Sequence, residues 1–389
     1  DLREAEAHAG VIEEEFEGDM DGGYLVKEAD GALEFLLNYA SMGFSLTQVE
    51  GFPDAPDDMT MNFEMADISG TTLLSLDAKK QTFAYGAGAL TYTVKATPPE
   101  GGLVDLQGSY SDLTFEGSTG IFDAADPEAM FRAEVPLDFT MDAAGSTFTF
   151  KGDGPEGALD MSLTGGASAL AAKIGEGQID YTFRGDDLDL ALSGNMMPVP
   201  VSARMAGYET RFAMPMVPTG RPGEMAVRLN ITDLTVEEAL WGMIDPAGNL
   251  PRDPANLMLD IVSKASALVS LMDEEAMLTG EMPFEFEDVE LKDLRVSLAG
   301  AEVTGRGSAV MNNAGPVPMP VGGVDVEIKG LNGLIGKLTE MGLVQPEQAM
   351  PVQMMMGMFA KPGEEPDTFT SRVEMTEDGG ITANGIPLQ

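Results

Sequence analysis

Met61-Asn62-Phe63-Glu64-Met65-Ala66 decides the fold class, because apolar side chains alternate with polar or small ones along it with a period of two. The same alternation returns in the stretches 148–150 and 188–192, and glycine-rich segments such as Gly101-Gly102 and Gly185-Asp186-Asp187 predict turns between such runs. Alternation of this kind is typical of antiparallel strands that are wet on one side. We therefore expect a mainly β (α+β) fold, with a large curved, mostly antiparallel sheet and a few covering helices.

The period of the apolar pattern divides the chain into three segments. Residues 1–60 are expected to be helical or irregular, because apolar residues recur at helical spacing within Glu28–Met42. Residues 61–230 are expected to form a β-rich meander. Residues 231–389 are expected to be β-rich with interspersed helices, and continuous with the preceding sheet.

The second half of the chain carries helix and hairpin signals. Thr235 and Glu238 have the spacing of a capping box ahead of an apolar run that Pro246 ends. Three further helices are predicted at 265–272, 331–341 and 346–359. The alternation from Phe369 to Met375, followed by Glu377-Asp378-Gly379-Gly380 and Ile381, predicts a closing hairpin.

A short pattern of Asp-Leu, a polar residue and an apolar residue occurs four times, beginning at Asp112, Asp187, Asp233 and Asp293. The spacings of 75, 46 and 60 residues are too irregular for a solenoid with a fixed period. Shared strand chemistry therefore explains the pattern better than duplication does.

The charge excludes several classes of partner. The chain has 65 Asp and Glu against 22 Lys and Arg, a formal net charge of −43. Nucleic acids and anionic membrane surfaces need clustered basic residues, so we expect neither as a partner. The hydrophobic share of 43% is that of a globular protein, and no apolar run has the roughly 20 residues of a membrane span. A saline habitat, in which cations screen an acidic surface, explains so much acid more simply than a specific cation-binding role does.

Most common catalytic and metal-binding chemistry lacks its residues. The chain has no cysteine and one histidine, His8, in a polar N-terminal stretch. We therefore expect no catalytic triad, no metal and no cofactor. A carboxylate-based hydrolase stays open as an alternative, because 65 acids supply many pairs by chance.

The methionines in 346–359 are the candidate ligand-binding residues. Flexible thioethers suit promiscuous hydrophobic ligands such as acyl chains. The candidate apolar lining comprises Met350, Met354, Met355, Met358 and Phe359. The more ordinary interpretation is that these side chains fill an irregular core between the sheet and its helices.

A series of segments in the C-terminal half is distinctive in its order. It comprises Leu240-Trp241, Asp245-Pro246, Leu250-Pro251-Arg252-Asp253-Pro254, the stretch 298–307, Lys329-Gly330-Leu331-Asn332-Gly333-Leu334 and the stretch 378–385. This order resembles an alphaproteobacterial family of predicted periplasmic proteins that forms a domain of unknown function. The resemblance implies a secreted envelope location and a β-rich fold, with a looser likeness to the apolar grooves of AsmA-like envelope proteins. It offers no catalytic residues.

These observations favour a non-enzymatic periplasmic or secreted protein that holds or transfers a lipid or other hydrophobic ligand along an apolar β-groove. The start at Asp1 fits a chain from which a signal peptide has been removed and equally fits an artificially shortened chain; with the periplasmic location, we expect a removed signal peptide. One alternative is an acidic structural or assembly factor that binds envelope proteins. The second alternative is the carboxylate-based hydrolase.

Overall fold

The computed structural model describes residues 12–15, 23–29, 32–48, 58–75, 77, 79–98, 101–122, 126, 128–133, 135–155, 157–273, 276, 278, 282–315 and 318–388. His8 and the acidic stretch 19–22 lie outside these residues. The chain divides into two compact units. Unit 1 comprises residues 1–121, 137–171 and 184–204, and unit 2 comprises 122–136, 172–183 and 205–389.

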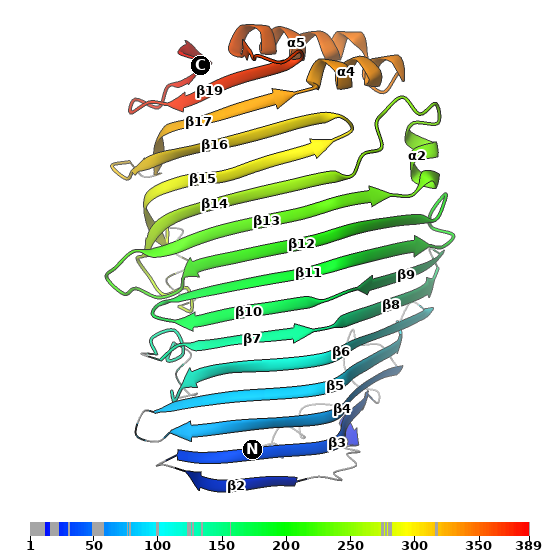
Figure 1. Cartoon of the computed structure of the whole chain (residues 1–389), viewed down its shortest axis with the longest axis vertical. Coiled ribbons are helices and arrows are strands. Elements are labelled where there is room, and N and C mark those ends of the chain that lie inside the picture. Colours follow the sequence, from blue (N-terminus) through cyan, green and yellow to red (C-terminus); the bar gives the residue numbers. More distant parts are fainter. Residues whose placement is uncertain are drawn as a thin grey trace. The chain divides into compact units, whose positions relative to one another are not determined.

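Unit 1 is an antiparallel meander of long strands (Figure 1). Its strands are β1 (Ile12–Glu15), β2 (Gly23–Ala29), β3 (Ala32–Gln48), β4 (Asp58–Ser75), β5 (Lys80–Thr97), β6 (Leu103–Gly120), β7 (Leu137–Ala143), β8 (Gly145–Gly154) and β9 (Gly157–Gly165). Consecutive strands pair from β2 to β6, and β6 then pairs with β7 along one half and with β8 along the other. Three strands contribute residues to both units: β10 (Ser168–Gly175), β11 (Gln178–Ser193) and β12 (Val201–Pro215).

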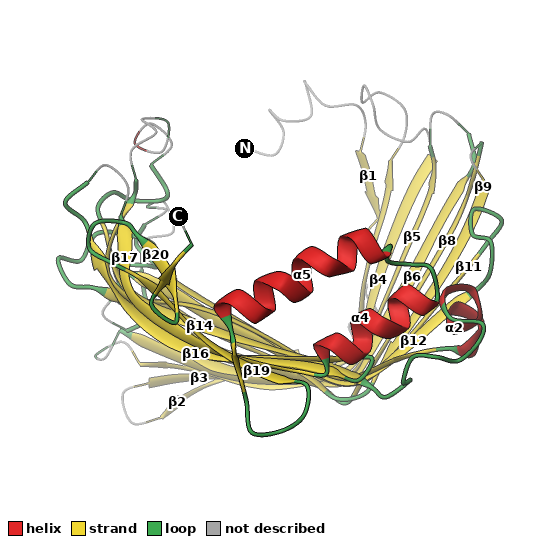
Figure 2. Ribbon diagram, turned by 90° about the horizontal axis from the view of Figure 1, so that it is seen from above, coloured by secondary structure: helices red, strands yellow, loops and turns green. Residues whose placement is uncertain are grey.

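Unit 2 continues the same antiparallel pattern and adds the helices. Its strands are β13 (Gly223–Val236), β14 (Ala255–Ala267), β15 (Phe284–Leu298), β16 (Ala301–Asn312), β17 (Met319–Lys329), β18 (Lys361–Pro362), β19 (Thr368–Met375), β20 (Ile381–Ala383) and β21 (Ile386–Pro387). Its helices are α2 (Glu238–Ile244), α4 (Leu331–Glu340) and α5 (Pro346–Phe359). Within unit 2 the strands bow, and α5 lies on their concave side (Figure 2).

The fold class is confirmed, because the structure is 66% strand and 10% helix, with a large antiparallel sheet. The helices predicted at 331–341 and 346–359 are present as α4 and α5. The closing hairpin is also present, with Met375 opposite Ile381.

Four local predictions are wrong. The described residues of Glu28–Met42 do not form a helix but lie in β2 and β3. Residues 32–37 are all half-buried, so buried side chains on both faces of the strand imitate a helical period. The segment 265–272 is the end of β14 followed by a turn. Thr235 belongs to β13, and the residue that caps α2 is Glu237, with no side-chain hydrogen bond. Gly185-Asp186-Asp187 lies inside β11 instead of in a turn.

The Asp-Leu pattern marks irregular positions inside long strands. Asp112, Asp187 and Asp233 have left-handed φ angles of 48°, 50° and 51°. The pairing of β13 with β14 shifts at Asp233, whose amide donates to Asn256 Oδ1 at 2.9 Å. The pairing of β15 with β16 shifts at Asp293. Aspartate tolerates the left-handed region better than most residues, so the pattern reports local backbone chemistry.

The buried core is built mostly from small residues. Of the sixteen hydrophobic residues that are buried in the described part of the chain, ten are alanines. The larger apolar side chains are mainly half-buried on the faces of the strands. A sheet of this kind leaves much of its apolar surface uncovered, and such surface commonly marks a binding site.

Candidate functional site

One face of the sheet in unit 2 is apolar across its width. The strand register places seven residues side by side, each opposite the next: Val227, Ile261, Leu291, Gly307, Val324, Val373 and Ala383. Six steps between strands at about 4.8 Å each give this row a length of about 29 Å. We call the surface built around this row the apolar face.

The apolar face contains three hollows of about 360, 380 and 350 Å³. The first two share Ile261, Val289 and Pro320, and the second and third share Val373. The hollows therefore adjoin, and together we call them the groove. Ser263 is the one polar residue among the thirteen that line the first hollow.

Small residues create the middle hollow. Gly307, Ala309 and Gly322 line it, where larger residues would fill the space above the strands. A Cβ atom at Gly307 would lie 2.4 Å from the carbonyl oxygen of Gly323, so this position requires glycine. The backbone of β16 and β17 thus forms much of the floor of the groove.

Helix α5 covers the third hollow. Val352, Met355, Met356 and Phe359 line the hollow from the helix, opposite Val326, Ile328 and Phe369 of the sheet. The C-terminal end of α5 is fixed by two hydrogen bonds to the Phe359 carbonyl oxygen, from Ser371 Oγ at 2.9 Å and from Asn384 Nδ2 at 2.8 Å.

The five residues proposed from the sequence divide into two groups. Met355 and Phe359 line the third hollow. Met350, Met354 and Met358 are more than half exposed and are not among its lining residues.

Two further residues of α5 that line the third hollow, Val352 and Met356, are not among the five proposed from the sequence. The stripe 352, 355, 356 and 359 has the spacing of one helix face, so this signal was present in the sequence.

The opposite face of unit 2 is polar. Along β17, Asp325 and Glu327 alternate with Val324, Val326 and Ile328, and alternate residues of a strand point to opposite faces. Several arginines on this face contact two carboxylates each. Arg211 contacts Asp180 and Glu224, and Arg228 contacts Glu209 and Asp260. The hydrogen bonds that Arg228 donates to the Asp260 carboxylate raise the pKa of the Arg228 guanidinium.

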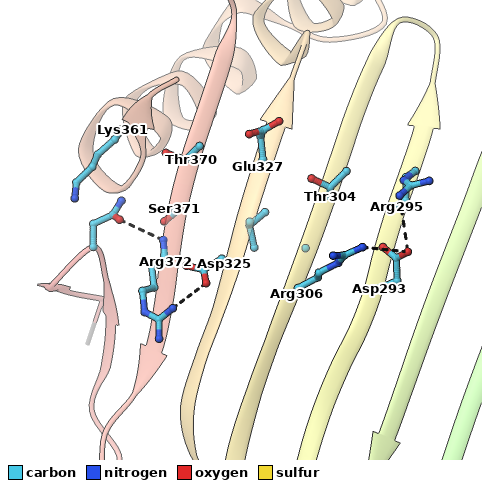
Figure 3. Close-up of a pocket in the computed structure, with 13 residues that line it drawn as sticks. Asp293, Arg295, Thr304, Arg306, Asp325, Glu327, Lys361, Thr370, Ser371 and Arg372 are labelled. Atoms are coloured by element: carbon cyan, nitrogen blue, oxygen red, sulfur yellow. Dashed lines mark hydrogen bonds and ion pairs between the residues drawn. The ribbon is translucent and has the colours of Figure 1, made fainter. Parts of the chain in front are cut away.

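A cleft of about 550 Å³ lies on this face (Figure 3). We call it the polar cleft. Its charged lining residues come from β15, β16, β17, β18 and β19, and they are Asp293, Arg295, Arg306, Asp325, Glu327, Lys361 and Arg372. Arg372 is held by Asp325 at 2.8 Å and by Glu374 at 2.9 Å.

Among the residues that the structure describes, the carboxyl groups with shifted pKa values have lowered pKa values, which is not the shift that a general acid needs. The Leu250 amide lowers the pKa of Asp245, the Thr376 hydroxyl lowers that of Asp378, and Lys173 lowers that of Glu176. A general acid at neutral pH needs a raised pKa. The carboxylate-based hydrolase therefore stays a prediction. The acidic assembly factor, which does not depend on these pKa values, also stays a prediction.

Among the described residues, no group of three or more His, Asp or Glu side chains could hold a metal ion. Within the same residues, no helix is both long and apolar enough to cross a membrane.

The segments that carry the family resemblance have structural roles. Asp245 is fully buried and accepts hydrogen bonds from the Leu250 amide at 2.7 Å and from Asn249 Nδ2 at 3.3 Å. The Arg252 guanidinium lies over the Trp241 ring at 5.6 Å. These contacts fix the loop that follows α2.

Asp367 fixes the start of α4 in a similar way, since its carboxylate accepts from the amides of Asn332 and Gly333 at 3.2 and 2.9 Å.

The structure thus defines a mainly β protein whose second unit has an apolar groove on one face and a polar cleft on the other. The sequence profile of a family described as uncharacterised proteins conserved in bacteria (DUF2125) matches residues 112–389. The chain belongs to this family. Comparisons with curated proteins and with solved structures give no match.

Proposed function

We propose that this protein is a non-enzymatic periplasmic protein that holds or transfers a lipid or other hydrophobic ligand along the groove of unit 2. The observation that carries the proposal is the continuity of the three hollows on the apolar face. The periplasmic location rests on the family resemblance described above.

The lining residues support a ligand with an apolar chain. A polar ligand would lose its hydrogen bonds to water in the first hollow, where one lining residue in thirteen is polar. An acyl chain loses no hydrogen bonds there. It also removes apolar side chains such as Val227, which is 47% exposed, from water.

The shape of the groove suits a long and narrow ligand. The row of residues across the apolar face is about 29 Å long at the usual spacing between strands. Each methylene group buried from water contributes about 0.8 kcal/mol, so a chain that extends over several strands supplies enough energy for stable binding.

Substitution of an exposed valine on each face tests the proposal. Val227 lines the first hollow, whereas Val310 lies on β16 in alternation with the groove residues Ala309 and Met311 and is 68% exposed. Val227→Glu and Val310→Glu each add one negative charge, so the net charge of the two variants is equal. The assay is uptake of a fluorescent fatty acid.

We expect Val227→Glu to weaken uptake at least about tenfold, because a carboxylate in an apolar hollow is costly to desolvate. Val310→Glu should bind as the unchanged protein does. Equal uptake by the two variants, or no uptake by the unchanged protein, would refute the proposal. Circular dichroism of both variants shows whether the sheet is retained.

A further inference from the structure

We infer that the polar cleft is a binding site for a small oxyanion of the phosphate class. This site is separate from the groove, because its charged side chains lie on the opposite face of the sheet in unit 2. Four basic and three acidic side chains line the cleft, in a chain whose formal net charge is −43.

The strand register sets the positions of these side chains. Arg306 lies opposite Asp325, and Asp325 lies opposite Arg372. A second row, two residues along the strands, runs from Arg295 through Thr304, Glu327 and Thr370 to Lys361. Basic side chains therefore stand at both ends of the cleft, with two threonine hydroxyls and the Glu327 carboxylate between them.

Two of the three acidic side chains are paired with basic side chains other than Arg295 and Arg306. Asp325 binds Arg372 at 2.8 Å, and Glu327 binds Lys329 at 3.2 Å. Arg295 and Arg306 are held more loosely, since both approach one atom, Asp293 Oδ2, at 3.8 and 3.9 Å. Figure 3 shows both guanidinium groups directed at this single carboxylate.

These two arginines can accept a further anion. Their side chains are 53% and 72% exposed, so an anion from solvent reaches them without displacement of a buried group. Guanidinium groups bind phosphate oxygens with two parallel hydrogen bonds each, which a carboxylate at nearly 4 Å does not provide. Thr304, which lies opposite Arg295 on the neighbouring strand, supplies a hydroxyl donor for a remaining oxygen.

The test is isothermal titration of the full chain with inorganic phosphate at low salt. We expect saturable binding with a Kd at or below about 1 mM, and about tenfold weaker binding for Arg306→Gln. Arg204→Gln is the matched control, because Arg204 is also exposed, at 71%, and pairs with Asp189 in unit 1. Its affinity for phosphate should be unchanged.

Asp293→Asn should change the affinity for phosphate in the opposite direction to Arg306→Gln. Removal of the carboxylate that competes for Arg295 and Arg306 should tighten phosphate binding about threefold or more. Damage to the fold cannot produce tighter binding, so this variant keeps the test decisive if Arg306→Gln is poorly folded.

A second arm distinguishes the source of the phosphate group. Phosphatidylcholine vesicles with and without phosphatidic acid are tested for co-sedimentation. Binding of the acidic vesicles that Arg306→Gln abolishes identifies a lipid headgroup, and binding of inorganic phosphate alone identifies a free ion. Absence of saturable phosphate binding up to about 10 mM, together with no Arg306-dependent vesicle binding, would overturn the inference.

Discussion

The length of the bound acyl chain should control affinity in a regular way. The perturbation is a series of saturated fatty acids that differ by two methylene groups, each measured below its micelle concentration. Burial of one methylene group contributes about 0.8 kcal/mol, which corresponds to about a fourfold change in Kd. Each step of the series should therefore tighten binding by about fifteenfold while the chain lies within the groove.

The structure also predicts where the gain stops. The three hollows adjoin across the apolar face, so affinity should level off when the chain exceeds a run of about 29 Å. Ala309→Phe fills the middle hollow, which Ala309 lines, and should make affinity level off at a shorter chain. Val310→Phe, on the opposite face, should leave the series unchanged.

Displacement of a fluorescent fatty acid measures the series for all three proteins. Affinity that is independent of chain length would refute the idea of a continuous groove. The same conclusion follows if Ala309→Phe and Val310→Phe give identical series.

Three further predictions concern the forces that hold the fold. Arg228→Leu should lower the free energy of unfolding in urea by about 2–3 kcal/mol, because the buried carboxylate of Asp260 loses its cation. Arg204→Leu is the control at an exposed ion pair and should lower the same free energy by less than about 1 kcal/mol. The pKa of Asp245 is lower in the folded chain than in the unfolded chain, where it is about 4. Ionised Asp245 therefore stabilises the fold above about pH 4, and this contribution is lost as the pH falls through the folded pKa. Asp245→Asn should accordingly lower Tm at about pH 7 and much less at about pH 3. Gly330→Ala should lower Tm more than Gly342→Ala. Both glycines have left-handed φ angles, but only at Gly330 would the new Cβ atom meet a backbone oxygen, that of Gly300 at 2.3 Å. The first argument is contradicted if Arg204→Leu destabilises the fold more than Arg228→Leu does. The second is contradicted if Asp245→Asn lowers Tm equally at both pH values, and the third if the two glycine substitutions lower Tm equally.

The sequence predicts the fold class well because the period of two is a local property. Met61, Phe63 and Met65 pair in register with Val94, Tyr92 and Leu90 of the next strand, as alternation on one face requires. The pattern fails where a strand is apolar on both faces, as β3 is over residues 32–37. Helix α5 was predictable from its length and from the many methionines and glutamines that favour a helix, whereas its apolar side chains lie around the whole helix and do not mark one face.

The groove could not be located from the sequence alone. Val227, Ile261 and Val324 are far apart in the chain, and the register that joins them includes shifts at Asp233 and between Asp260 and Ile261. Local alternation shows neither the register nor these shifts.

The methionines of α5 drew attention to the right helix. Consecutive residues spread around a helix, however, so Met355 and Met356 line the groove while Met354 and Met358 do not. Met355 is nevertheless 58% exposed.

The most direct test of lipid binding is native mass spectrometry of the full chain, expressed in bacteria and purified without detergent. The account predicts a population whose mass exceeds that of the chain by one lipid, lost on Val227→Glu and retained on Val310→Glu. A single mass equal to that of the bare chain, with no lipid in its organic extract and no uptake of added fatty acid, would contradict it.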